Sequence, residues 1–125
     1  MERFSGKYII TKDMEWEKLG GGVSRKFLGY DNQIMMVRVK FEEGALGSPH
    51  QHFHTQATFC VSGKFEFKID GEKKIVEAGD GVYIEPNLLH SCICLEEGEL
   101  IDTFSPVRED FLTGGPVSYF GDKES

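Results

Sequence analysis

Three of the four histidines in this 125-residue sequence stand in one short segment, "GSPHQHFHTQ". His50, His52 and His54 alternate there with other residues, and Gln56 continues the alternation. Side chains two positions apart on a strand point to the same side, so His50 and His52 could bind one metal ion. Gln56 can join them if the backbone turns or bulges locally. The alternative is a polar loop that happens to be rich in histidine.

A metal site of this kind also needs a ligand from another part of the chain. His90 is the remaining histidine, and it follows the turn "IEPNLLH" at the start of the expected strand "SCIC". Imidazole nitrogens bind divalent ions at about 2.0–2.1 Å, so the side chains must converge from more than one element. A β-barrel provides such convergence.

A second group of residues could bind and protonate a substrate. In "ELIDTF", Asp102 shares a strand face with Phe104, and an acid on an apolar face is either solvated at a barrel mouth or catalytic with a raised pKa. Arg108 follows a Ser-Pro turn that could fold it back over the opening, where its guanidinium could hold a carboxylate by two hydrogen bonds. The alternatives are a surface ion pair with Glu109 or Asp110 for Arg108, and a core position for Phe104.

The elements that must position these residues are expected to be short strands joined by turns. Glycine is abundant, with 15 residues, proline is sparse, with 4, and apolar runs are short and alternating. The predicted strands are residues 34–41, 64–69, 72–77 and 81–86, with a hairpin turn at Asp70-Gly71, and two more within residues 91–104, separated by a turn at Glu97-Gly98. No segment has a convincing helical period, and a short turn within residues 13–19 is the best helical candidate. We therefore expect an all-β sandwich or barrel.

Length and composition predict one domain over residues 1–125, with a core at about 13–112 and a C-terminal tail at 113–125. A chain of this length can bury a core without a structural metal, so a bound metal would serve function. The net charge of -7 and the isoelectric point of about 5.1 argue against nucleic acid as a partner. Three cysteines argue against a disulfide framework, and we expect a reduced, cytoplasmic protein without a membrane partner.

Two segments resemble the two motifs of the cupin superfamily. Residues 44–63 contain a glycine, His-x-His, an amide four residues on and a glycine turn at Gly63. Residues 78–92 contain a Gly-Asp turn, a strand, a proline and the last histidine. The resemblance implies a double-stranded β-helix, or jelly-roll barrel. Ala78 and Asn87 depart from the family's usual proline and glycine at turn positions. Gln56 stands where many cupins have Glu, which leaves the charge of a bound ion uncompensated by its ligands.

Residues 16–45, 50–56 and 100–112 together are similar to the pectin-degradation cupins called KdgF. This resemblance implies a dimeric enzyme that converts small anionic sugars, the 4,5-unsaturated monouronates from pectin or alginate, to 5-keto-4-deoxyuronate. It also implies one divalent transition metal ion, Ni, Fe, Mn, Zn or Co. The family's metal ligands carry over to His50, His52, Gln56 and His90, and its other site residues to Asp102, Phe104 and Arg108.

Several alternatives remain open at this stage. A cupin with this ligand set could instead be a dioxygenase or another isomerase, or a non-catalytic module that binds uronates. His54 has the parity of the ligands, but the family pattern places it around the site rather than on the metal. The three cysteines are expected to be small buried hydrophobes, not metal ligands. They are Cys60, Cys92 and Cys94. In the tail, Tyr119 and Phe120 could contact the body or a second subunit.

Overall fold

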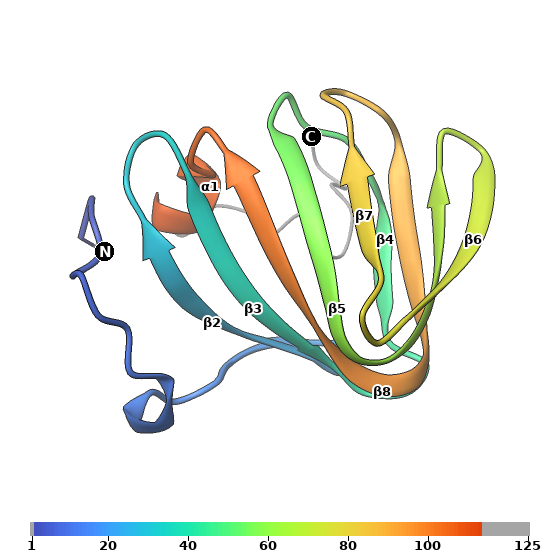
Figure 1. The fold of residues 1–125 in the computed structure, drawn as a ribbon, viewed down its shortest axis with the longest axis horizontal. Coiled ribbons are helices and arrows are strands. Elements are labelled where there is room, and N and C mark those ends of the chain that lie inside the picture. The colour runs from blue at the N-terminus through green and yellow to red at the C-terminus, as the bar shows by residue number, and fades with distance from the viewer. Residues whose placement is uncertain (1, 114–125) are drawn as a thin grey trace.

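The computed structural model describes residues 2–113, which form strands that fold into a barrel and a few short helical turns (Figure 1). All strand pairs are antiparallel, in the order β1-β2-β3-β8-β5-β6, with β4 also paired to β8 and β7 to β5. The elements are η1 (Thr11–Asp13), β1 (Glu17–Gly20), β2 (Val23–Tyr30), β3 (Met35–Phe41), β4 (Leu46–His50), β5 (Thr55–Ile69), β6 (Glu72–Glu77), β7 (Gly81–Ile84), β8 (His90–Ser105) and α1 (Glu109–Thr113).

The alternation of apolar residues decides which side of each strand faces the barrel interior. On β3, Met35, Val37 and Val39 are fully buried, while Met36 between them is exposed, as the sequence pattern predicts. On β5, Phe65 and Phe67 point inward, and Phe65 packs edge-on against Phe41 of β3. The interior is therefore filled by side chains from facing strands, which is how a small barrel holds a rigid shape.

Two long strands, β5 and β8, tie the barrel together. They pair with each other along their length, and each exchanges its other neighbour midway: β8 passes from β4 to β3, and β5 from β7 to β6. Both strands bend sharply where they are opposite each other (Figure 1), with register shifts around Ser62 and Lys64. This exchange lets one eight-stranded sheet fold over on itself and confirms the predicted all-β jelly roll.

The predicted turn at Glu97-Gly98 is wrong, because β8 runs through these residues without reversing. A side chain at Gly98 would overlap the backbone of Ser62 and Gly63, and one at Gly63 would meet the carbonyl oxygens of Glu96 and Glu97 at 2.6 Å. Gly63 also has a left-handed φ of 85°. These two glycines lie where the backbones of two continuous strands, β5 and β8, cross closely. The glycine turn predicted at Gly63 is therefore wrong as well, because β5 continues through it.

The ends of the described chain differ from the predictions in detail. The helical turn predicted within residues 13–19 is a 3-10 turn at Thr11–Asp13, and Glu17–Gly20 form strand β1. The five-residue helix α1 was not predicted, because its period is too short to detect in the sequence. The predicted tail, with Tyr119 and Phe120, lies outside the described residues except for Thr113. None of the described helices is long and apolar enough to span a membrane.

Candidate metal centre

Three histidines meet where two strand ends and a loop come together. β4 ends at His50, a loop carries His52, and β8 begins at His90, which is paired in register with His50. The candidate ligand atoms of these histidines all lie within 4.8 Å of one another. The idea that the ligands share one side of a single strand is wrong, because the chain leaves the sheet after His50. The loop turn, rather than period-two alternation, brings His52 to the others.

Local backbone hydrogen bonds decide which nitrogen of each ring is available. Nδ1 of His50 lies 2.8 Å from the Ser48 carbonyl oxygen, and Nδ1 of His90 lies 2.9 Å from that of Leu88. Nδ1 of His52 likewise lies 3.1 Å from the backbone oxygen of His54. A carbonyl can only accept, so Nδ1 of His50 and of His90 carries the proton and Nε2 of each presents a lone pair. Nε2 of His52 also faces a carbonyl oxygen, that of Gln56 at 3.0 Å, so this ring presents an Nε2 lone pair when its proton is donated to His54. Two imidazoles are thus fixed in the tautomer that a metal ligand requires, and the third has a partner for that tautomer.

The surroundings keep these rings neutral. Burial lowers the pKa of His50 to about 3, with the nearby His90 adding to the effect, and burial lowers the pKa of His52 to about 4. The pKa of His90 is also lowered by burial. Nε2 of His90 is buried without a hydrogen-bond partner among residues 2–113, which is costly for a polar atom unless something else satisfies it. A cation would satisfy it.

Gln56 adds an oxygen to the three nitrogens. Its Oε1 lies 3.0 Å from Nε2 of His52, while its Nε2 donates to Thr58 Oγ1 at 2.9 Å. With the His52 proton on Nδ1, the lone pair of its Nε2 and Gln56 Oε1 are two acceptors that face each other, an arrangement that a shared cation makes favourable. Three imidazole nitrogens and an amide oxygen are donors that first-row divalent ions accept. The residues His50, His52, Gln56 and His90 therefore fit one such ion.

A buried acid lies directly behind the amide. Asp102 on β8 is 5% exposed, and its Oδ1 accepts hydrogen bonds from Thr58 Oγ1 at 2.7 Å and Gln56 Nε2 at 3.4 Å. Burial raises the pKa of Asp102 to about 6, although the Thr58 hydrogen bond, the Arg108 charge and the Gln56 hydrogen bond act in the opposite direction. A carboxyl group with a pKa near neutrality can both give and take a proton.

Arg108 lies at the same cavity, but it is not a surface ion pair. It is 2% exposed and binds Asp110 through Nε at 3.0 Å and Nη2 at 2.8 Å. Its guanidinium lies over the rings of Phe104, at 5.0 Å, and Phe111, at 4.3 Å. Glu109, the other partner considered from sequence, pairs with Arg3 instead. Phe104 is 1% exposed and contacts His52 edge-on, so it serves both the core and the site.

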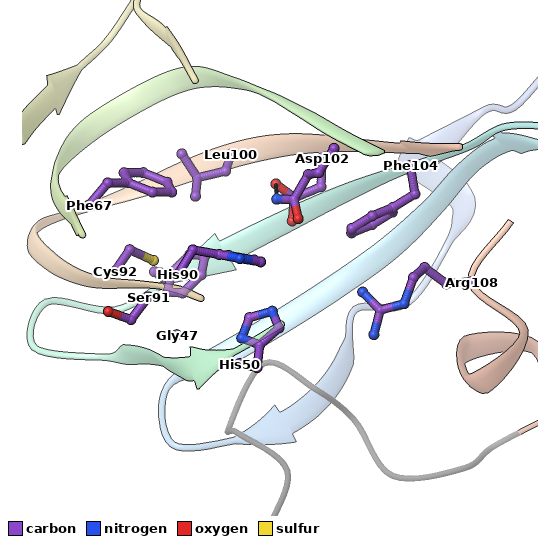
Figure 2. Close-up of a pocket in the computed structure, with 12 residues that line it drawn as sticks. Gly47, His50, Phe67, His90, Ser91, Cys92, Leu100, Asp102, Phe104 and Arg108 are labelled. Carbon is purple, nitrogen blue, oxygen red and sulfur yellow. Dashed lines mark hydrogen bonds between the residues drawn. The ribbon is translucent and has the colours of Figure 1, made fainter. Parts of the chain in front are cut away.

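These residues line one cavity with a polar and an apolar part. Figure 2 shows His50, His90 and Asp102 converging between Arg108 at one end and Phe67 at the other. The other residues that line the cavity are Phe41, Gly47, Gln56, Ser91, Cys92, Leu100 and Phe104. The predicted site residues are thus brought together around one space, with His52 beside them through its contacts to Gln56 and Phe104.

Sequence reasoning missed Thr58 and the Arg108–Asp110 pair. Simple alternation from Gln56 along β5 could have placed Thr58 on the inner face. Its contact with Asp102 depends on the β5–β8 register, in which these two residues are direct partners. Asp110 comes close to Arg108 only because α1 turns the chain back after residue 108.

His54 and the three cysteines lie outside the group of described residues that could hold an ion. The ring of His54 packs edge-on against that of His52 and stacks on Phe53, and its Nε2 bonds the Val107 carbonyl at 3.2 Å. All three cysteines are free thiols, and the described group of potential metal ligands contains none of them. Burial raises the pKa of Cys92, which lines the cavity, to about 12, so this thiol stays protonated.

Comparison with known proteins places this geometry in a family. Residues 37–104 match the family model described as "Cupin domain". The chain is 45% identical over 108 residues to the pectin degradation protein KdgF of Dickeya dadantii. The aligned region covers 85% of this chain and 98% of that protein.

Two solved structures are similar over most of their length. An RmlC-like cupin from Shewanella frigidimarina has a TM-score of 0.86 and 39% identity, covering 88% of this chain and 99% of that one. KdgF from a Halomonas species has a TM-score of 0.82 and 36% identity, covering 86% and 99% respectively. The cupin domain of Cnp3 from Schizosaccharomyces pombe, at 12% identity and a TM-score of 0.69, shares the fold.

Proposed function

This chain belongs to the cupin domain family and is similar to KdgF over most of its length, and from that premise we propose that it is a metal-dependent enzyme of uronate breakdown. Its reaction would be the linearisation and ketonisation of 4,5-unsaturated monouronates released from pectin or alginate. The observation that carries the proposal is the buried Gln56–Asp102 contact, which joins a neutral cation-binding group to a carboxyl group inside one cavity.

The cation would be held by His50, His52, Gln56 and His90. Once bound, it would act as a Lewis acid that polarises oxygens of the sugar. All four ligands are neutral, so the charge of the ion is available to attract an anionic substrate. We propose one divalent transition ion, and the same ligands accept Ni, Fe, Mn, Zn or Co.

Arg108 is proposed to bind the sugar carboxylate. It lies at one end of the cavity, where Asp110 and the rings of Phe104 and Phe111 hold its guanidinium in place. A guanidinium fixed in this way loses little side-chain freedom when a carboxylate binds. Phe104 offers an apolar surface for the sugar ring next to it.

Asp102 is proposed to transfer the proton. Both of its side-chain hydrogen bonds end on Oδ1, and no described residue donates to Oδ2. Ring opening breaks the hemiacetal bond and leaves an enol, and the enol becomes a ketone when its oxygen loses a proton and the far carbon of the double bond gains one. A group with a pKa near neutrality suits this exchange, because no electrons are transferred and only a proton moves.

The test follows the ultraviolet absorbance of the 4,5-double bond in unsaturated galacturonate monomer. We expect the metal-loaded protein to accelerate its loss, and His50→Ala and Asp102→Asn to return it to the spontaneous rate. Asp70→Asn is the matched control, because Asp70 is exposed at a hairpin turn with a φ of 49° that asparagine tolerates. An unchanged rate with metal bound would refute the proposed reaction, and oxygen uptake with small substrates would then favour a dioxygenase.

The remaining sequence predictions accompany this proposal. A small anionic sugar as partner, a homodimer and a cytoplasmic protein without nucleic-acid or membrane partners stay predictions. The single domain over residues 1–125 stays a prediction as well.

A further inference from the structure

One buried polar residue behind the cavity lining has no part in the function proposed above. Thr58 on β5 is 5% exposed and lies between Gln56 and Asp102. Its Oγ1 is 2.9 Å from Gln56 Nε2 and 2.7 Å from Asp102 Oδ1, both shorter than the direct 3.4 Å contact between Gln56 and Asp102. The hydroxyl is therefore the main link between the amide and the acid.

The donors and acceptors in this link allow one consistent direction. A threonine hydroxyl has a single hydrogen, and a carboxylate can only accept, so that hydrogen goes to Asp102. Thr58 Oγ1 must then accept from its other neighbour, which requires the NH2 end of the Gln56 amide to face it. The carbonyl end of Gln56 consequently faces His52, where Oε1 lies 3.0 Å from Nε2.

The opposite orientation of the amide would remove a metal donor. With the amide turned over, its NH2 would face the lone pair on His52 Nε2 and could donate to it. The cavity would then lose both the amide oxygen and the lone pair of His52 as ligands. Without a hydroxyl at position 58, only the long contact to Asp102 would oppose this rotation.

We propose that Thr58 is a positioning residue, whose hydroxyl holds the Gln56 amide with its oxygen toward the histidines and so keeps four donors available to a cation. This inference rests on the cation site of the proposed function, but not on the identity of the substrate. Outer partners of metal ligands act in this way in other sites, where their loss lowers metal affinity or activity about 10–100-fold.

The experiment measures Co²⁺ affinity by competition with a chelator, with the visible spectrum of bound Co²⁺ as a second readout. Thr58→Val replaces the hydroxyl with a methyl group of similar size, and we expect about 10-fold weaker binding or more. Thr58→Ser keeps the hydroxyl and should bind as wild type does. Thr103→Val is the matched control, since Thr103 lies on the outer face of β8.

A second pair of variants keeps the test decisive if Thr58→Val does not fold. Thr58→Ser and Thr58→Ala both lose the methyl group and differ only in the hydroxyl, so their ratio of Co²⁺ affinities isolates its effect. Equal affinity in these two variants, or wild-type affinity in Thr58→Val, would overturn the proposal. Where uronate turnover is present, the Val variant should lower kcat more than it raises KM, because Thr58 does not line the cavity.

The two proposals fail in distinguishable ways. Loss of Co²⁺ affinity in Thr58→Val with no uronate turnover in wild type would support the positioning role and refute the substrate. Turnover in wild type with unchanged Co²⁺ affinity in Thr58→Val would refute the positioning role alone.

Discussion

Replacing Gln56 with glutamate would test how the cation site and the buried acid depend on each other. The substitution changes one NH2 group to an oxygen at the position of Gln56 Nε2, which lies 3.4 Å from Asp102 Oδ1. At an effective dielectric constant of about 20, two unit charges at that separation repel each other by about 5 kcal/mol.

The metal-free variant should avoid this repulsion by keeping a proton. Burial already raises the pKa of Asp102 to about 6, so holding its proton at pH 7 costs about 1.4 kcal/mol, which is less than the repulsion. The pair would thus share one proton in the folded state. We expect metal-free Gln56→Glu to have a free energy of unfolding at least about 1.4 kcal/mol lower than wild type at pH 7.

The pH dependence gives the sign of this effect. A carboxyl pKa raised by folding means that the folded state binds more protons, so stability falls as pH rises above the unfolded pKa. The deficit should shrink toward zero at pH 5, where Asp102 is largely protonated in wild type as well. Divalent metal should also reduce it and bind more tightly than to wild type, because glutamate adds a negative ligand.

The assay is urea unfolding of metal-free protein at pH 5 and pH 7, together with turnover of the loaded protein. Turnover should fall at pH 7, because Asp102 beside a second carboxylate would hold its proton. Gln33→Glu is the matched control, since Gln33 is exposed in a turn. A deficit that does not change with pH would contradict the shared proton and the coupling argued from the structure.

Three further predictions follow from the same cavity. Asp102→Asn should lower kcat by about 10²–10⁴-fold while Co²⁺ affinity measured by chelator competition stays near wild type, and equal losses of both would assign Asp102 to metal binding. Arg108→Lys should raise KM for the uronate more than it lowers kcat, because an ammonium does not reproduce the two-point guanidinium contact. Steady-state kinetics would instead show a larger fall in kcat than rise in KM if Arg108 acted on the reacting atoms. The free energy of unfolding of the metal-free protein should fall as pH falls below about 6.5, because histidines with lowered pKa values take up protons only on unfolding, each contributing about 1.4 kcal/mol per pH unit. In urea unfolding at several pH values, His50→Ala should show a weaker dependence of this free energy on pH. An unchanged dependence would refute the neutral state of the His50 ring.

The strand faces were predictable because a short alternating pattern reports burial directly. Residues 35–41 show it well, since every second side chain is buried in the structure. Turn chemistry was also readable where the backbone conformation is special. Asn87, which stands in place of the family's glycine, has a left-handed φ of 67°, and asparagine tolerates that conformation better than most residues. Its N–H bonds the His52 carbonyl at 2.7 Å, so this turn also supports the histidine loop.

Glycine misled the prediction where two strands cross. Gly98 follows two acidic residues, and such a sequence usually marks a turn. The structure uses it because Ser62 and Gly63 of β5 come too close for any side chain there. A single sequence does not report which distant backbone lies against a glycine. The same limit hid the Thr58–Asp102 contact, which exists only in the β5–β8 register.

The two halves of the site are held by different kinds of structure. The histidine tautomers depend on carbonyl groups only two residues away, Ser48, His54 and Leu88, so short segments of chain prepare the nitrogen donors. The amide oxygen and the acid depend on long-range pairing of β5 with β8, which sets Thr58 opposite Asp102.

This division explains why motif spacing identifies the nitrogen donors readily and the acid less so. Two short segments of sequence record the local carbonyl contacts of the histidines, whereas the environment of Asp102 is assembled from strands 44 residues apart. It also assigns a reason to glutamine at position 56. A neutral amide can bind a cation on one side and donate to a carboxyl group on the other, whereas a carboxylate there could only accept from Thr58 and would repel Asp102.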